Sequence, residues 1–317
     1  MRIRWLMAVL ILTVFISGCV EQNGGNEVTP TYNDNALNME VKIQEKVENR
    51  RILPGSTMRM VVTLTNQVEN ATNGVDLKIT NPYGIQISKV DCGSNCVCLW
   101  GQTENPCDSS PGVSCSFNGC HYDSIQSLDM KEITFGLKVP GEEEISSLGR
   151  DLKPNIIVKY NYSGTSALYI PIYRYGEKPV EPKKESPPPT KGPIHVSIDS
   201  DDWVRSGDLF PIYVNVKDVV QSSEKLMIYN DSFEMFICNA QKEGMGRCDF
   251  IGPINDYYYQ PKENITLPLS NPLVCTLKAN PIEVPMVKAS IVIDYSYTYK
   301  VEKIETIRVE KAFLGIF

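Results

Sequence analysis

Histidine is scarce in this sequence, with two residues, His121 and His195, among 317. A Ser-His-Asp triad or a histidine-ligated metal would have to use one of them. His195 alternates with apolar neighbours as a strand residue does, and His121 directly follows a cysteine. The sequence also lacks the Gly-x-Ser-x-Gly, His-Glu-x-x-His, phosphate-loop and dinucleotide-binding motifs. We therefore expect no catalytic residue, no cofactor and no resident metal.

Positive charge is in the minority as well. The chain has 31 lysines and arginines against 38 aspartates and glutamates, a net charge of −7 at pH 7. No stretch gathers the basic residues into a stripe, which binding to the phosphates of nucleic acid requires. We therefore expect no nucleic-acid partner.

Long hydrophobic runs are missing too, since a spanning helix takes about 20 apolar residues. The run from Trp5 to Ile16 is shorter, follows Arg2 and Arg4, and ends at Ser17-Gly18-Cys19. A short basic head, an apolar core and a small-residue exit are typical of an export signal. We expect residues 1–19 to be such a signal.

The ending Ile16-Ser17-Gly18-Cys19 resembles the lipobox of exported lipoproteins. In that family the cysteine is lipidated on its sulfur and becomes the first residue of the mature chain. The resemblance implies this role for Cys19, with the membrane as a partner and the extracytoplasmic face of the cell membrane as the location. An uncleaved apolar anchor and a simply secreted form are the alternatives. The polar residues 20–38 then form a flexible stalk.

Amphipathic helical patterns are absent, and short stretches of alternating apolar and polar residues replace them. Before residue 176 we expect strands at 39–43, 58–64, 75–79, 85–87, 133–139, 156–160 and 168–172. After residue 193 we expect strands at 194–198, 212–216, 233–237, 265–267, 289–295 and 304–309. This pattern predicts an all-β protein with two immunoglobulin-like antiparallel β-sandwiches, at 39–175 and 194–312. Residues 313–317 form an apolar C-terminal tail.

Residues 176–193 (GEKPVEPKKESPPPTKGP) separate the two predicted sandwiches. Their prolines favour an extended polyproline helix, and their charges keep the segment in water. At roughly 3.1 Å per residue the extended segment would span on the order of 50 Å. We expect a semi-rigid linker between the domains.

The two halves resemble each other. Residues 156–163 (IIVKYNYS) align with 291–298 (IVIDYSYT), so that in both an apolar strand ends in two tyrosines one residue apart. We expect a hairpin partner to follow each of these strands. A glycine turn, Gly55-Ser56 or Gly207-Asp208, precedes the second strand of each half. These features favour a duplicated sandwich domain over the alternative that any two hairpins share such alternation.

Residues 64–66 (LTN) and 71–84 (ATNGVDLKITNPYG) resemble the strand-turn-strand portion of immunoglobulin-like domains on archaeal and bacterial surface proteins, including the CARDB type. The second half has Val216-Lys217-Asp218 where the Thr-Asn would stand, so the resemblance covers part of the first half alone. Members of such families are mostly adhesive, spacing or scaffolding modules. The resemblance therefore implies a sandwich fold and an envelope setting, and no reaction.

Nine cysteines remain when Cys19 is assigned to the anchor. Six crowd into a polar insert at 91–121: Cys92, Cys96, Cys98, Cys107, Cys115 and Cys120. Outside the cytoplasm we expect three disulfides there, and the sequence does not choose among the fifteen pairings. A metal site is the alternative, but the spacing fits neither the zinc nor the ferredoxin pattern. In the second half Cys238 and Cys248 could close a short loop, and pairing of Cys275 with either of them, or with a second molecule, stays open.

Several surface features are candidates for modification or binding. Four Asn-x-Ser/Thr sequons are candidate glycosylation sites: Asn70, Asn161, Asn230 and Asn264. The consecutive Tyr257, Tyr258 and Tyr259 are a possible binding loop, with packing beneath the loop as the alternative. The acidic run 199–202 lacks the spacing of a calcium loop, and we expect a solvated turn.

These features favour a lipid-anchored cell-surface protein with a non-catalytic role in binding, adhesion or structural spacing. Its partner would be an envelope protein or a glycan. A substrate-capturing lipoprotein of a transporter is one alternative, although such receptors are usually α/β proteins. An envelope hydrolase is another, and it would have to use His121 or carboxylates.

The anchor assignment makes a direct prediction. Cys19→Ser should abolish lipid labelling and release the protein from membranes, because the two acyl chains that hold it would have no attachment point. Labelling with a radioactive fatty acid, followed by membrane fractionation, measures both effects. Membrane retention of the variant would instead favour an uncleaved apolar anchor.

Overall fold

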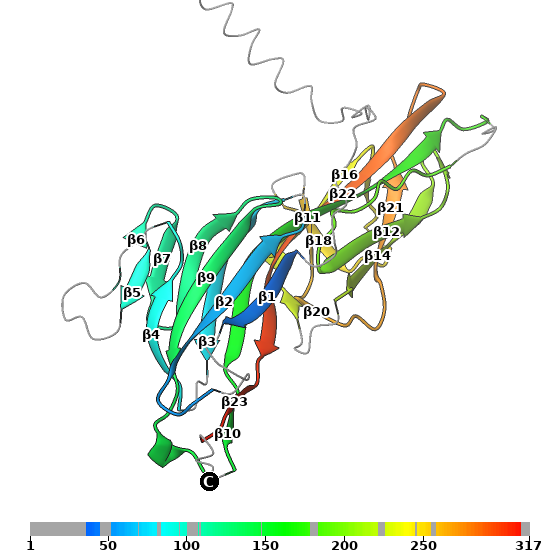
Figure 1. The fold of residues 1–317 in the computed structure, drawn as a ribbon. Coiled ribbons are helices and arrows are strands. Elements are labelled where there is room, and N and C mark those ends of the chain that lie inside the picture. The colour runs from blue at the N-terminus through cyan, green and yellow to red at the C-terminus, as the bar shows by residue number, and fades with distance from the viewer. Residues whose placement is uncertain are drawn as a thin grey trace, which may run out of the picture.

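Two stretches of the sequence alternate between apolar and polar residues for much longer than a common strand of about five or six residues. In the computed structural model each is a single strand of 19 residues, β11 (Asn155–Tyr173) and β22 (Met286–Ile304). They pair antiparallel along their whole length, with Asn155 opposite Ile304 and Tyr173 opposite Met286. Figure 1 shows this pair running diagonally through both halves of the molecule.

The structure describes residues 36–44, 52–68, 70–80, 84–94, 96–99, 107, 109–146, 148–177, 183–220, 226–244, 246–254 and 258–311. In these ranges the regular structure is β-strand, apart from the short 3-10 turns η2 (Glu142–Glu144) and η3 (Asn230–Ser232). The all-β sandwich prediction is confirmed. Cys19, the expected signal and the tail at 313–317 lie outside the described residues.

The N-terminal half of β11 is part of a sandwich that we call the first lobe. Strands β3, β8, β7 and β6 continue the shared sheet beside β11, and the facing sheet has the order β1-β2-β9-β4-β5. The bounds are β1 Leu37–Gln44, β2 Thr57–Asn66, β3 Thr72–Thr80, β4 Gln86–Asp91, β5 Val97–Leu99, β6 Ser109–Ser110, β7 Val113–Ser116, β8 Gly119–Ile125 and β9 Met130–Lys138.

The N-terminal half of β22 is part of the second lobe. Strands β16, β19 and β18 continue the shared sheet beside β22, β13 pairs with the end of β11, and the facing sheet has the order β12-β14-β21-β17. The bounds are β12 Ile194–Ser200, β13 Val204–Arg205, β14 Leu209–Asp218, β16 Phe233–Cys238, β17 Ala240–Lys242, β18 Phe250–Ile254, β19 Tyr258–Pro261 and β21 Leu273–Ala279. A separate pair joins β15 (Met227–Ile228) to β20 (Ile265–Thr266).

The strand order supports the duplication that the sequence indicates. The order β1-β2-β9-β4 of the first lobe corresponds to β12-β14-β21-β17 of the second, and β3 beside β11 corresponds to β16 beside β22. The sequence alignment equates Tyr162 with Tyr297, and the structure places these two residues directly opposite each other. The two copies are therefore related by a local twofold through this pair.

The two lobes exchange strands. The boundary between them therefore does not fall at the proline-rich segment, where the composition of the sequence changes. The C-terminal half of β11 lies in the second lobe, and the C-terminal half of β22 lies in the first. A further strand, β23 (Ile307–Val309), returns to the first lobe and pairs with β10 (Arg150–Leu152). An ion pair of 2.9 Å between Arg308 and Asp151 joins these two strands.

The predicted linker does not stand between two separate bodies. Glu185 and Tyr169 exchange backbone hydrogen bonds of 2.8 and 2.9 Å, and the N–H of Thr190 donates to the carbonyl of Thr165. Residues 183–193 therefore run back along β11 toward the middle of the molecule. The prediction that this segment spaces the two domains apart is corrected. Its residues instead hydrogen-bond the backbone N–H and C=O groups along β11.

Buried tyrosines fill the seam between the two facing sheets. Every second residue of β11 and of β22 points to the buried face, and at the middle these residues are Tyr160, Tyr162, Tyr295, Tyr297 and Tyr299. Neighbouring rings lie 5.7 to 6.3 Å apart between centroids. Burial raises the pKa of Tyr295 and Tyr297, so both stay neutral hydroxyls over the whole physiological range.

The tyrosine hydroxyls bind the chain that enters the second lobe. Tyr297 accepts from the N–H of Ile194 at 3.2 Å, and Tyr295 donates to the carbonyl of Ile194 at 3.3 Å. Tyr162 donates to the carbonyl of Lys191. The end of the proline-rich segment and the start of β12 are therefore fixed at the seam, where buried hydroxyls need partners.

The expected hairpins after the paired tyrosines were wrong. Residues 156–160 and 168–172 belong to the same strand, because the chain runs straight through Ser163-Gly164-Thr165. Gly164 lies directly opposite Tyr295, and a Cβ there would lie 2.5 Å from the Tyr295 hydroxyl oxygen. This glycine makes room for a ring and does not mark a turn.

Gly164→Ala should destabilise the fold by about 1–3 kcal/mol, because the added methyl overpacks the Tyr295 ring. Chemical denaturation with urea measures this as a lower unfolding midpoint. Gly141→Ala is the matched control, since Gly141 has a φ of −67° and no atom within 4 Å of its added Cβ. Equal midpoints for the two variants would contradict the assigned role of Gly164.

Candidate functional site

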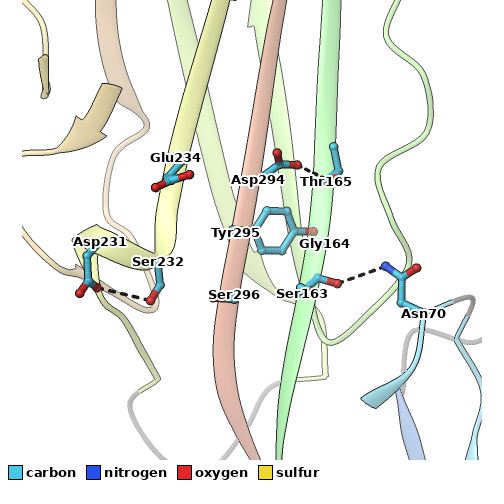
Figure 2. A pocket seen from close by; sticks show the side chains of 10 residues that line it. All are labelled: Asn70, Ser163, Gly164, Thr165, Asp231, Ser232, Glu234, Asp294, Tyr295 and Ser296. Atoms are coloured by element: carbon cyan, nitrogen blue, oxygen red, sulfur yellow. Dashed lines mark hydrogen bonds between the residues drawn. The ribbon is translucent and has the colours of Figure 1, made fainter. Parts of the chain in front are cut away.

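A polar depression of about 410 Å³ lies on the outer face of the shared sheet, where the two lobes meet. Its lining comes from β11, β22, η3, the start of β16 and the loop before β3: Asn70, Ser163, Gly164, Thr165, Asp231, Ser232, Glu234, Asp294, Tyr295 and Ser296. Figure 2 shows the hydroxyls of β11 between Asn70 on one side and the carboxylates on the other.

The strand register sets the order of the polar groups. Glu234 stands opposite Asp294, which in turn stands opposite Thr165, so one row crosses three neighbouring strands. The hydroxyl of Thr165 donates to Oδ1 of Asp294 at 2.6 Å. Ser163 and Ser296 face each other in the next row. These outer residues alternate with the buried tyrosines because successive side chains of a strand point to opposite faces.

Three of the four sequons contribute to this depression. Asn70 lines it directly and donates from Nδ2 to the carbonyl of Ser163 at 3.4 Å. Ser163 is the hydroxyl residue of the sequon at Asn161, and Ser232 is that of the sequon at Asn230. The fourth lies beside the third, because the side chain of Asn264 accepts from the N–H of Asn230 at 3.0 Å.

The depression offers hydroxyl, amide and carboxylate groups beside the ring of Tyr295. Groups of these kinds can hydrogen-bond hydroxyl-rich molecules such as glycans. Sequence reasoning found the sequons but missed the depression, because its residues come from four distant segments. The polar positions Asn161, Ser163 and Thr165 alternate through the supposed turn, and that alternation was the available signal.

His121 lies in a different row, on the outer face of the first lobe. Its strand neighbours are Asp76 on β3 and Ser114 on β7, which gives the residue types of a hydrolase triad. Both ring nitrogens face carboxylates, since Nδ1 is 3.0 Å from Asp76 and Nε2 is 3.5 Å from Asp123. A triad needs the second nitrogen on the serine hydroxyl. His195, as expected, is a strand residue of β12.

Disulfides hold loops in both lobes. Among the described cysteines the structure joins Cys92 to Cys120, Cys98 to Cys107 and Cys248 to Cys275. The short loop considered between Cys238 and Cys248 is corrected, because Cys248 lies beside β21, which carries Cys275.

Two sets of three sulfurs in the insert are close enough to hold a metal ion, Cys92-Cys96-Cys115 and Cys98-Cys107-Cys115. Each set includes at least one disulfide sulfur, which carries no thiolate charge and is a poor ligand. The insert therefore favours covalent cross-linking over metal binding.

The acidic run at 199–202 surrounds an ammonium group of the chain itself. Nζ of Lys184, in the proline-rich segment, lies 2.6 Å from Oδ1 of Asp199 and 3.8 Å from Oδ1 of Asp202. The hydrogen bond from Lys184 holds the pKa of Asp199 below its usual 3.8, and the same bond raises the pKa of Lys184 above 10.5. This ion pair fastens the returning segment to the second lobe.

Two of the three consecutive tyrosines, Tyr258 and Tyr259, belong to a strand and not to a loop. Tyr258 and Tyr259 open β19, where Tyr259 is buried and Tyr258 is 40% exposed. The ring of Tyr258 lies 6.1 Å from that of Phe236 on the neighbouring strand. Tyr257 lies outside the described residues. Packing against the sheet therefore accounts for Tyr259, whose side chain is not available to a partner.

Comparison with known proteins gives no family. No protein-family model matches the sequence, and no curated protein is similar to it. Among solved structures, a protein from Corynebacterium diphtheriae named for a membrane anchor aligns over 87% of this chain and 92% of its own, at 7% identity and a TM-score of 0.14. Salmonella alpha-2-macroglobulin reacted with methylamine aligns over 92% of this chain and 18% of its own, at 8% identity and a TM-score of 0.16. Likeness at this level carries no argument about function.

In the part of the chain that the structure describes, no helix is long and apolar enough to cross a membrane.

Lys184→Met should loosen the returning segment at neutral pH. The carboxylate contribution is present above the ordinary pKa of Asp199 and is lost as pH falls through its lowered value, while the ammonium contribution is lost only as pH rises through the raised pKa of Lys184. We expect faster amide exchange at Glu185 in the variant, measured by hydrogen exchange and mass spectrometry.

The neighbouring Lys183→Met is the matched control, because Lys183 is exposed and the same charge is removed. As the pH falls through the lowered pKa of Asp199, the carboxylate becomes protonated and the wild type should approach the Lys184 variant. Identical exchange in all three proteins at neutral pH would show that the ion pair does not hold the segment.

Proposed function

We propose that this protein is a lipid-anchored cell-surface protein with a non-catalytic role in binding or structural spacing outside the cytoplasm. The observation that carries the proposal is the pairing of β11 with β22 over 19 residues, which joins two sandwiches into one stiff body. Stiffness suits a molecule that holds a partner at a set position.

The anchor would join this body at its middle. The carbonyl of Ala36 accepts from the N–H of Gln67 at 2.8 Å, and Ala36 and Leu37 are both buried at the start of β1. A hydrogen bond links Tyr160 of the seam to the backbone of Leu37. A stalk ending here leaves the outer ends of both lobes clear of the attachment point.

The same pairing argues against a transporter receptor. Such receptors capture ligands by closing two lobes about a hinge, which needs a few backbone positions that absorb large dihedral changes. Here a change of angle between the lobes would break ladder hydrogen bonds and separate the buried tyrosine rings. A hydrolase is disfavoured by the two carboxylates that occupy both ring nitrogens of His121.

The gathering of sequons on one face fits the proposed location. Sugars at Asn70, Asn161, Asn230 and Asn264 would cover the outer face of the shared sheet at the seam. The facing sheets and the outer ends of the lobes would remain for a protein partner. At the outer end of the second lobe, where β11 ends and β22 begins, Tyr175 is 80% exposed and Met286 is 44% exposed.

A distance measurement between the lobes tests the stiff-body proposal. Spin labels on bio-orthogonal side chains at Met130 in the first lobe and Met286 in the second should give one narrow distance distribution. Because the lobes share a continuous strand ladder, small molecules in extracts of the growth medium should not change this distance distribution. A broad distribution, or one that a small molecule narrows or moves, would support the capturing receptor.

Cross-linking on intact cells identifies the partner. A photo-reactive side chain at Tyr175 should capture an envelope protein or glycan, and the same group at Leu148 near the opposite end is the matched control. Turnover of an envelope substrate that His121→Asn abolishes would contradict a non-catalytic role.

A further inference from the structure

All six cysteines of the polar insert meet at one corner of the first lobe. Cys92 follows the end of β4, and its disulfide to Cys120 joins β4 to β8 with a Cα–Cα distance of 5.8 Å. Cys98 on β5 is bridged to Cys107. Cys115 on β7 stands directly opposite Cys120 in the β7–β8 hairpin.

Cys96 and Cys115 extend this arrangement. The N–H of Cys92 donates to the carbonyl of Cys96, and the N–H of Cys96 donates to the carbonyl of Gly93, both at 2.9 Å, so a tight turn holds Cys96 beside Cys92. The sulfurs of Cys92, Cys96 and Cys115 all lie within 4.8 Å of one another. Cys96 is buried and Cys115 is half-buried.

We infer that Cys96 and Cys115 form a third disulfide in the mature protein, next to the bridge between Cys92 and Cys120. The turn that carries Cys92 and Cys96 is already tied to the hairpin that carries Cys115 and Cys120. The sulfurs of Cys96 and Cys115 lie within 4.8 Å of each other, so a second bridge between the same two segments has to close a gap of less than about 3 Å to reach the usual S–S length of about 2.05 Å. The hydroxyl of Tyr122 fixes the turn further by donating to the carbonyl of Cys92 at 2.7 Å.

A rival pairing starts from the contact of 3.1 Å between the sulfurs of Cys98 and Cys115. A bond between these two would break the bridge to Cys107 and leave the number of disulfides unchanged. Joining Cys107 to Cys96 would then be needed to complete the set, yet these two sulfurs belong to different close groups. The pairing of Cys96 with Cys115 keeps both bridges that the structure shows in the insert, Cys92 to Cys120 and Cys98 to Cys107.

The bond forms by oxidation. Two S–H bonds break and one S–S bond forms, and the two electrons and two protons pass to the disulfide of an extracytoplasmic thiol oxidant, whose S–S bond breaks to give two thiols. The inference thus rests on the proposed location outside the cytoplasm. Its consequence is an insert whose six cysteines are all cross-linked, so that its surface is a fixed shape.

Thiol counting on the full-length protein from membranes tests the inference. The protein is unfolded in guanidinium at low pH and alkylated without reduction, and trypsin then releases residues 90–131 as one fragment that carries all six cysteines and no internal Lys or Arg. We expect no label on this fragment before reduction and six labels after it. Cys96→Ser should expose one label, located on Cys115, and Cys115→Ser should expose one located on Cys96.

Each other outcome overturns a distinct claim. Labels on Cys96 and Cys115 alone in the unreduced wild type would refute the third bridge. The proposal that the protein is exported would stand, because the other four cysteines would still be in disulfides. Six labels before reduction would refute export, and the proposed function with it. A label on Cys107 in Cys96→Ser would establish the rival pairing. If neither serine variant accumulates, the wild-type count alone decides.

Discussion

The antiparallel ladder between β11 and β22 is the constraint on which the rest of the structure depends. Each strand buries one face along most of its length, so apolar cover is needed along most of the pair, and two facing sheets supply it side by side. Where those sheets meet, large tyrosines of β11 and β22 are buried in the seam, and their hydroxyls must find partners there. The backbone at Lys191 and Ile194 provides them, which fixes where the chain enters the second lobe.

Local pattern predicted the strands, because alternation is a property of neighbouring residues. Most expected strands coincide with observed ones, including β2, β3, β9, β12 and β14. The errors came from residues whose role depends on a distant partner. Gly164 resembles a turn residue until the ring of Tyr295 is placed against it. The prolines of 183–193 predict extension correctly, but extension is equally suited to lying along the edge of β11, where Glu185 and Thr190 find backbone partners. Sequence composition sets a segment's stiffness and not its direction.

The candidate site could not be predicted from local sequence patterns, because its residues are also distant in the sequence. Its residues become neighbours only through the register of three strands, which sets Glu234, Asp294 and Thr165 in one row. Disulfide connectivity shows the limit even more clearly. The number of cysteines and the redox setting predict cross-links, whereas the choice of Cys248 with Cys275 depends on which strands lie side by side.

A shared ladder also decides what kind of work the protein can do. A ligand shifts a conformational equilibrium only when two states bind it differently, and two lobes joined by a continuous sheet offer no second arrangement at low cost. Recognition must then come from surfaces that are already formed, namely the facing sheets, the outer ends of the lobes and the cross-linked insert. If sugars occupy the sequon face at the seam, that face is closed to proteins, while the outer ends of the two lobes lie away from the point where β1 enters the body. If the proposed anchor holds the molecule at its middle, the function of the protein would be to present these fixed surfaces to a neighbouring partner at a set distance.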